Sequence, residues 1–152
     1  MRTSIIPDLI DAMVADFAGL LGDEVTVSDG YPVTNNPGTY LFVGVDDPTD
    51  RTPATSATAT QDWPLATPTG RSEEGDVTLA AESWNGEADQ KRARDEVFGV
   101  AGAIQNRLRE SKTLGVPGVL WLSFTNLRLE QAQAEAGAGA RLVFQVHFEA
   151  RI

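Results

Sequence analysis

The stretch LVFQVHFEARI, residues 142–152, decides the fold class of this chain. Apolar side chains stand at every second position, from Leu142 to Ile152, and polar ones fill most positions between them. Because successive side chains of a strand point to opposite faces, the pattern predicts a strand with one face on a hydrophobic core. The other face is polar apart from Val143, so we expect it to meet water or a partner. We also expect the strand to tie down this end of the chain.

Size and composition favour one folded domain that spans residues 1–152. The chain is 41% hydrophobic and 22% charged, as is typical of soluble globular proteins. No apolar run approaches the roughly 20 residues that cross a bilayer, and the early Pro7 and Asp8 argue against a signal peptide. Cysteine is absent, which excludes disulfides and thiolate chemistry and suits a cytosolic origin.

The formal net charge of −10 is unevenly distributed. Residues 1–76 hold three basic and thirteen acidic side chains, whereas residues 77–152 hold nine of each. An acidic surface repels phosphates, which argues against a protein that grips DNA but permits one past which DNA slides. Acidity that serves solubility alone is the simpler interpretation.

The first part of the chain predicts a helix and two strands. The helix is expected over residues 5–21, with Ser4 as its cap and Gly22 as its stop. Its apolar stripe consists of Ile6, Leu9, Met13, Phe17 and Leu20. Residues 25–27 indicate a short strand, and residues 40–45 form a continuous apolar run typical of a strand covered on both faces.

Residues 47–76 differ in character from the rest of the chain. They contain four prolines, many Thr and Ala, and few side chains large enough to fill a core. Residues 54–61 alternate small and hydroxyl side chains and could form a strand, whereas the remainder, including Trp63, is predicted to be an extended loop. A loop this long within a compact domain is usually functional or disordered, and we interpret residues 47–76 as an arm that becomes ordered against a partner.

The second half predicts strands on either side of a long helix. A strand over residues 77–84 precedes a helix over residues 87–111. The buried stripe of this helix is formed by Val97, Val100, Ala101, Ile104 and Leu108. A further strand over residues 119–131 is joined to the last one by the small residues 133–139, as in a hairpin. The order predicts an α+β fold: a mixed, largely antiparallel sheet with two main helices packed on it, plus the long extended arm.

No residue pattern indicates a catalytic residue or a bound cofactor. His147 is the only histidine, and no Gly-x-Ser-x-Gly elbow supports a Ser/His/Asp triad, so we interpret it as a surface or interface residue. Arg92 and Arg94 could contact phosphate, but acidic neighbours favour intrahelical or intersubunit ion pairs. Residues 137–139 are a flexible turn rather than a nucleotide loop, and Trp84 is more typical of a core cap than of a ligand platform.

Two acidic groups offer oxygen ligands to a hard cation. The first comprises Asp46, Asp47 and Asp50, and the second comprises Glu73, Glu74 and Asp76. Pro48 interrupts the first group, and the alternating pattern of a calcium loop is missing from both. We therefore interpret both as solvated acidic turns and expect no metal site.

Six short stretches follow one another along most of the chain. They are VSDGYPVT (27–34), LFVGVDDP (41–48), QDW (61–63), EGDV (74–77), SWNG (83–86) and FEARI (148–152). In this order they resemble the tail terminator (tail completion) proteins of long-tailed bacteriophages that infect actinobacteria. The resemblance implies a small subunit of a hexameric ring, which caps the finished tail tube, stops its polymerisation and provides the docking surface for the head connector. The family has no catalytic residues to transfer.

The resemblance also implies the partners and the location. The partners would be further copies of this chain, the major tail tube protein and a head connector or stopper protein, with genome DNA passing through the lumen without specific binding and no membrane. The ring would lie at the head–tail junction of the virion, after assembly in the host cytoplasm. The alternatives are a head–tail connector or head completion protein of the same neck region, and a small metal- or ligand-binding domain.

This interpretation assigns residues to two surfaces. The acidic candidates for the channel surface are Asp46, Asp47, Asp50, Glu73, Glu74 and Asp76. The candidates for the subunit or tube interface are Arg51, Trp63, Arg71, Arg92, Arg94, His147 and Arg151. An acidic lining would let DNA pass without sticking, because no counterions are released there to favour binding.

Overall fold

The computed structural model describes residues 2–31, 37–47, 54–63 and 70–152. The elements in chain order are α1 (Ile6–Leu21), a short 3-10 helix η1 (Gly22–Glu24), β1 (Val25–Asp29), β2 (Gly38–Val43), β3 (Ala57–Asp62), β4 (Ser72–Asn85), α2 (Gln90–Glu110), β5 (Val119–Ala134) and β6 (Gly137–Arg151). Within these residues, neither helix has the length and apolar character needed to cross a membrane.

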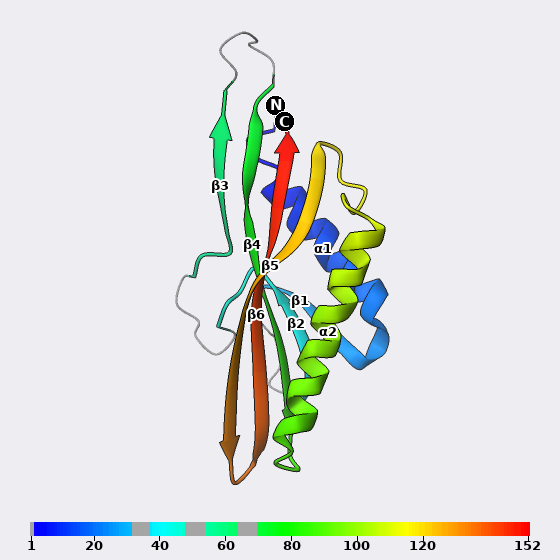
Figure 1. Ribbon diagram of the computed structural model, residues 1–152, viewed down its shortest axis with the longest axis vertical. Helices are drawn as coiled ribbons and strands as arrows, with labels where there is room; N and C mark the ends of the chain where they lie inside the picture. The colour runs from blue at the N-terminus through cyan, green and yellow to red at the C-terminus, as the bar shows by residue number, and fades with distance from the viewer. Residues whose placement is uncertain (1, 32–36, 48–53, 64–69) are drawn as a thin grey trace.

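The strands form one sheet in the order β1-β2-β4-β6-β5, with β3 paired to β4 outside this path. β1 and β2 run parallel, and the other strand pairs are antiparallel. One edge of β4 pairs with β2 along residues 79–84 and with β3 along residues 72–77. The other edge of β4 pairs with β6 over its whole length. Figure 1 shows both helices on the same side of the sheet, so the predicted α+β fold is confirmed.

The alternation of the last strand produces two different faces. Leu142, Phe144 and Val146 of β6 are completely buried against α1 and α2. We call this side of the sheet the helix-covered face, and the opposite side, which carries Val143, Gln145 and His147 on β6, the helix-free face. The predicted buried stripe of α2 is also confirmed, since all five of its residues belong to the same core.

The stripe predicted for α1 is correct only in the middle of the helix. Leu9, Met13 and Phe17 are completely buried. At the start, Ile5 takes the core position that was predicted for Ile6, and at the end Leu20 is 40% exposed. Periodicity alone predicts an apolar stripe but does not show how far neighbouring elements cover its two ends.

The loop predicted over residues 47–76 is wrong in extent. β3 forms within the predicted strand region, and β4 begins at Ser72 rather than at residue 77. Gly75 permits this pairing, because a Cβ atom at that position would lie 2.0 Å from the carbonyl oxygen of Thr58. The parts of the predicted arm at residues 48–53 and 64–69 lie outside the described residues, so its ordering against a partner stays a prediction.

The end of the last strand is held by backbone hydrogen bonds, as predicted. The Arg71 N–H donates to the Ile152 carbonyl oxygen at 2.7 Å, and the Ile152 N–H donates back at 2.9 Å. The Arg151 N–H donates to the Gly118 carbonyl oxygen at 2.8 Å. These bonds join the segments that precede β4 and β5 to the end of β6.

Candidate functional site

Glu73 lies on the helix-covered face of β4 and is only 1% exposed. Its Oε1 accepts hydrogen bonds from Ser4 Oγ at 2.8 Å and from the Ile5 N–H at 2.9 Å, where α1 begins. Gln61 of β3 donates to its other oxygen. The sheet thus supplies a carboxylate at the positive end of α1, while Ser4, the predicted cap, accepts the Ile6 N–H at 3.1 Å. The channel-facing role predicted for Glu73 is therefore wrong.

Arg71 is also an internal residue, with 7% of its surface exposed. Its Nη2 donates to the Thr3 carbonyl oxygen at 2.7 Å and to that of Arg2, and its Nε donates to Gln61 Oε1 at 3.1 Å. The guanidinium carbon lies 5.0 Å from the ring centroid of Trp63. The interface role predicted for Arg71 is therefore wrong, because its donors are used within the chain. Trp63 remains 55% exposed and keeps its place among the interface candidates.

Asp47 belongs to a group of ion pairs around Arg141. Its Oδ1 lies 3.2 Å from Arg141 Nη1, and the same arginine lies 3.2 Å from Glu82 Oε2 and 3.2 Å from Glu130 Oε2. The Arg141 side chain is 17% exposed, so this positive charge is partly buried among three carboxylates on the helix-free face. Asp47 thus forms an ion pair, and its side chain is still 43% accessible to solvent.

The other candidates from the two predicted surfaces occupy varied positions. Asp46 is half-buried and lines a hollow of about 320 Å³ beside Thr78 and Gln145. Arg94 is half-buried on α2, and Arg151 is exposed at the end of β6. Two further candidates, Asp50 and Arg51, lie outside the described residues.

His147 projects from the helix-free face between two carboxylates of β4. Its Nδ1 lies 3.1 Å from Asp76 Oδ1, and its Nε2 lies 3.2 Å from Glu74 Oε1. Trp121 of β5 lies against the imidazole with ring centroids 5.4 Å apart, and its Nε1 donates to Glu149 Oε2 at 2.8 Å. The structure thus brings together three residues named as candidates from the sequence, Glu74, Asp76 and His147. It adds Trp121 and Glu149, which the sequence analysis did not identify. Glu149 stands two places after His147 and so shares its face of the strand, a signal already present in the sequence.

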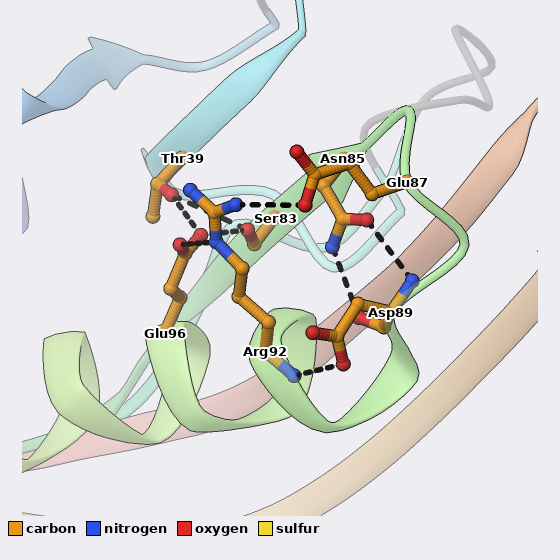
Figure 2. A network of polar contacts seen from close by, with 7 residues as sticks. All are labelled: Thr39, Ser83, Asn85, Glu87, Asp89, Arg92 and Glu96. Atoms are coloured by element: carbon orange, nitrogen blue, oxygen red, sulfur yellow. Dashed lines mark hydrogen bonds and ion pairs between the residues drawn. The ribbon is translucent and has the colours of Figure 1, made fainter.

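A second polar cluster lies at the start of α2 (Figure 2). Arg92 Nη1 lies 3.3 Å from Glu87 Oε2, and Arg92 Nε lies 3.2 Å from Glu96 Oε1, so the intrahelical ion pair predicted for Arg92 is confirmed. Glu96 Oε2 accepts hydrogen bonds from Thr39 Oγ1 at 2.9 Å and from Ser83 Oγ, which connects α2 to β2 and β4. The Ser83 hydrogen bond lowers the pKa of Glu96 and outweighs desolvation, and Thr39 and Arg92 lower this pKa further.

The hairpin between β5 and β6 is tighter than predicted. Ala134 pairs with Gly137, so residues 137–139 begin β6 instead of forming a flexible turn. A Cβ atom on Gly139 would lie 2.4 Å from the ring of Trp84. The ring of Trp84 therefore covers the backbone of the neighbouring strand at this point, and only glycine leaves room for it.

Exposed apolar side chains on β5 and α2 form a surface that the sequence analysis did not identify. Leu127 is 58% exposed, Leu129 is 37% exposed and Phe98 of α2 is 42% exposed. A hollow of about 320 Å³ between α2 and β5 is lined by Phe98 and Leu127. Leu127 and Leu129 alternate with charged residues, which predicts a buried face. β5 is an edge strand, however, and both side chains remain partly exposed there. Such a row of apolar side chains is typical of a protein–protein contact.

No protein-family model and no curated protein matches this sequence. Among solved structures, the chain is similar to one from a structure described as the virion of a native gene transfer agent (GTA) particle. The TM-score is 0.57, the sequence identity is 16%, and the likeness covers 98% of this chain and 100% of that chain. The two chains therefore share one fold over their whole length, from the first helix to the last strand.

Proposed function

We propose that this chain is a structural protein of a phage-like virion and acts there as the tail terminator. The observation that carries the proposal is the structural similarity to a chain of a GTA virion, which covers 98% of this chain and 100% of that chain. The resemblance of the six sequence stretches to tail terminator proteins supports the same role from separate evidence. In this role the chain works by shape and self-association, without catalysis.

The edge of β5 supports assembly into a ring. It is an edge strand of the sheet, so its outer backbone groups have no partner strand within the described part of the chain. Leu127 and Leu129 add apolar surface beside this edge, and the hollow near Phe98 is open to a neighbouring subunit. A contact between two different surfaces of the same subunit closes into a ring when the rotation permits, and we propose a hexamer. Further candidates for subunit or tube contacts are Trp63, Arg94 and Arg151.

The acidic residues of the helix-free face suit a surface that lines a DNA channel. Glu74 and Asp76 lie on this face of β4, and Asp47 reaches it through Arg141. Asp46 lines the hollow on the same side. We propose that these four residues face the lumen, together with Asp50, and that they keep DNA from sticking as it passes. Replacing Glu74, Asp76 and Asp46 together by their amides is expected to slow DNA ejection, and an unchanged ejection rate would contradict this orientation.

The decisive experiment compares particles assembled with and without this chain by electron microscopy. Without it, tail tubes are expected to exceed their normal length and vary in it, and filled heads are expected to remain separate. Tails of normal, uniform length joined to filled heads would exclude the terminator role. Tails of normal length without heads would indicate instead the connector or head completion protein of the same neck region.

The ring contact has its own test by native mass spectrometry in the presence of the tail tube protein. Replacement of Leu127 and Leu129 by Glu is expected to abolish the hexamer on the tube while the subunit stays folded, because both side chains are exposed in the monomer. The matched control is Leu20→Glu, since Leu20 is exposed on α1, away from β5. Equal ring formation by the double variant and the control would show that the β5 edge is not the subunit contact.

A further inference from the structure

His147 and the four side chains around it, Glu74, Asp76, Trp121 and Glu149, have the arrangement of a metal site in which some residues hold the ion and others orient them. Glu74, His147 and Glu149 each direct one possible ligand atom to a common point, and these atoms lie within 4.8 Å of one another. Of these atoms, His147 Nε2 and Glu74 Oε1 lie 3.2 Å apart. Ligands around a tetrahedral Zn²⁺ with bonds of about 2.1 Å lie about 3.4 Å apart. Small side-chain rotations would therefore bring the set around one ion.

The two nitrogens of His147 face carboxylates on both sides, Asp76 at Nδ1 and Glu74 at Nε2. A neutral imidazole carries one N–H donor, so it satisfies Asp76 or Glu74 but leaves a lone pair facing the other carboxylate. Either a second proton or a cation at Nε2 removes this repulsion. Glu149 adds a further carboxylate, with its ligand atom within 4.8 Å of those of Glu74 and His147, which favours a cation with a charge above one.

Two neighbouring residues orient the ligands in the way that outer-shell residues do in metalloproteins. Asp76 Oδ1 lies 3.1 Å from Nδ1, where it would accept the proton of that nitrogen when Nε2 binds a cation. The Trp121 Nε1–H donates to Glu149 Oε2 at 2.8 Å and leaves the other oxygen of Glu149 available. The charged groups around the imidazole thus come from two strands, Glu74 and Asp76 from β4 and Glu149 from β6, while β5 supplies the indole.

We propose that Glu74, His147 and Glu149 bind one divalent transition-metal ion, preferentially Zn²⁺, on the helix-free face. The imidazole nitrogen selects against Ca²⁺ and Mg²⁺, which prefer oxygen ligands. Three protein ligands leave a fourth position for water or for a group from a partner. The ion bridges β4 and β6 and reduces the negative charge of this part of the face. The site is independent of the tail terminator role, since it follows from the side chains of a single subunit.

The test is a titration of the full chain with Zn²⁺ alone, measured by isothermal titration calorimetry. One ion per chain is expected, and Glu74→Gln and His147→Gln are each expected to weaken binding by at least about 100-fold, more than the loss of an outer-shell residue. Asp76→Asn is expected to weaken it by about 10-fold. Glu130→Gln is the matched control, because it removes an equal charge from the same face without touching the cluster.

A second measurement excludes effects of misfolding. Zn²⁺ is expected to raise the Tm of the wild-type chain and of Glu130→Gln, but not that of Glu74→Gln, whose exposed side chain is 62% accessible and contributes little to folding. Bound Co²⁺ is expected to give the visible absorption of a low-symmetry site with a nitrogen ligand. Absence of Zn²⁺ binding would overturn the proposal. Binding that is equal in Glu74→Gln and the wild type would overturn it as well.

Discussion

Glu73 and Glu74 are neighbours on β4, yet the two faces of the sheet place them in opposite environments. Glu73 is 1% exposed and holds the start of α1, whereas the side chain of Glu74 is 62% exposed and faces His147. Because a strand turns successive side chains to opposite sides, one step along the chain separates a structural carboxylate from one that is available to a ligand. The same carboxylate chemistry thus serves stability on one face and binding on the other.

The two faces differ in this way beyond these two residues. On the helix-covered face the polar groups are internal and satisfied, and no buried side-chain nitrogen or oxygen in the described residues lacks a partner. On the helix-free face the charged groups are partly exposed, as Arg141 and His147 are with 17% and 21% of their side chains accessible. Substitutions of the internal polar residues on the first face are therefore expected to reduce stability, and those of the partly exposed charged residues on the second to reduce interactions.

The largest expected effect is on the helix-covered face at Phe144. This side chain is completely buried and stacks on Phe124 with ring centroids 4.6 Å apart. Phe144→Ala is expected to lower the free energy of unfolding by about 4 kcal/mol, because it leaves a cavity in the core. Gln145→Ala, one residue along on the other face, is the control and is expected to cost less than about 1 kcal/mol in urea unfolding. Equal losses would remove the distinction between the faces.

The second prediction concerns the two neighbouring carboxylates directly. Glu73→Ala is expected to lower the free energy of unfolding by about 3 kcal/mol, since it leaves the Ile5 N–H and Gln61 without their buried acceptor. Glu74→Ala is expected to change it by less than about 0.5 kcal/mol in the same urea titration. A loss at Glu74 as large as that at Glu73 would show that both carboxylates are structural.

A smaller effect is expected in the pH dependence of stability at Glu96, which connects α2 to the sheet. Its pKa is lowered in the folded state, chiefly by the Ser83 hydrogen bond, so its stabilising contribution is present above its ordinary pKa of 4.5. That contribution is lost as the pH falls through the lowered value. Glu96→Gln is expected to flatten the fall in stability on acidification from about pH 5 to about pH 3, and Ser83→Ala to act in the same direction. An unchanged slope in Glu96→Gln, from urea unfolding at each pH, would contradict this.

The smallest expected effect is that of a solvent-exposed ion pair on α2. Lys91 and Asp95 pair there with 76% and 58% of their side chains accessible. Lys91→Ala is expected to change the free energy of unfolding by less than about 0.5 kcal/mol, because water and salt screen such pairs. Thermal unfolding at low and high salt measures this, and a loss above about 1 kcal/mol would indicate that this pair is coupled to the rest of the fold.

The fold class was predictable because its signals are local. The alternation in β6 and the stripe of α2 each lie within one element, and both are confirmed residue by residue. Ends and edges were less predictable. Ile5 replaces Ile6 in the core, and Leu127 and Leu129 remain exposed, because periodicity identifies an apolar face but not how far a neighbouring element covers it.

The polar clusters were predictable only as separate residues. His147 and Asp76 were both identified from the sequence, but they are 71 residues apart and were assigned to different surfaces. Glu73 was interpreted as part of an acidic turn because the surrounding segment is rich in proline and small residues. Its strand became recognisable only through pairing with β3 and β6.

Local periodicity was enough to identify an α+β chain with an amphipathic last strand. A repeat of 2 or 3.6 residues shows which side of a single strand or helix is buried. The contacts between Glu74, His147 and Glu149 depend instead on how β4 and β6 are aligned. That alignment pairs Glu74 with Glu149 and Asp76 with His147. A shift by a single residue would turn one strand's side chains to the opposite face and separate the cluster. Register is set by packing of the whole sheet against its helices, and no short stretch of residues encodes it.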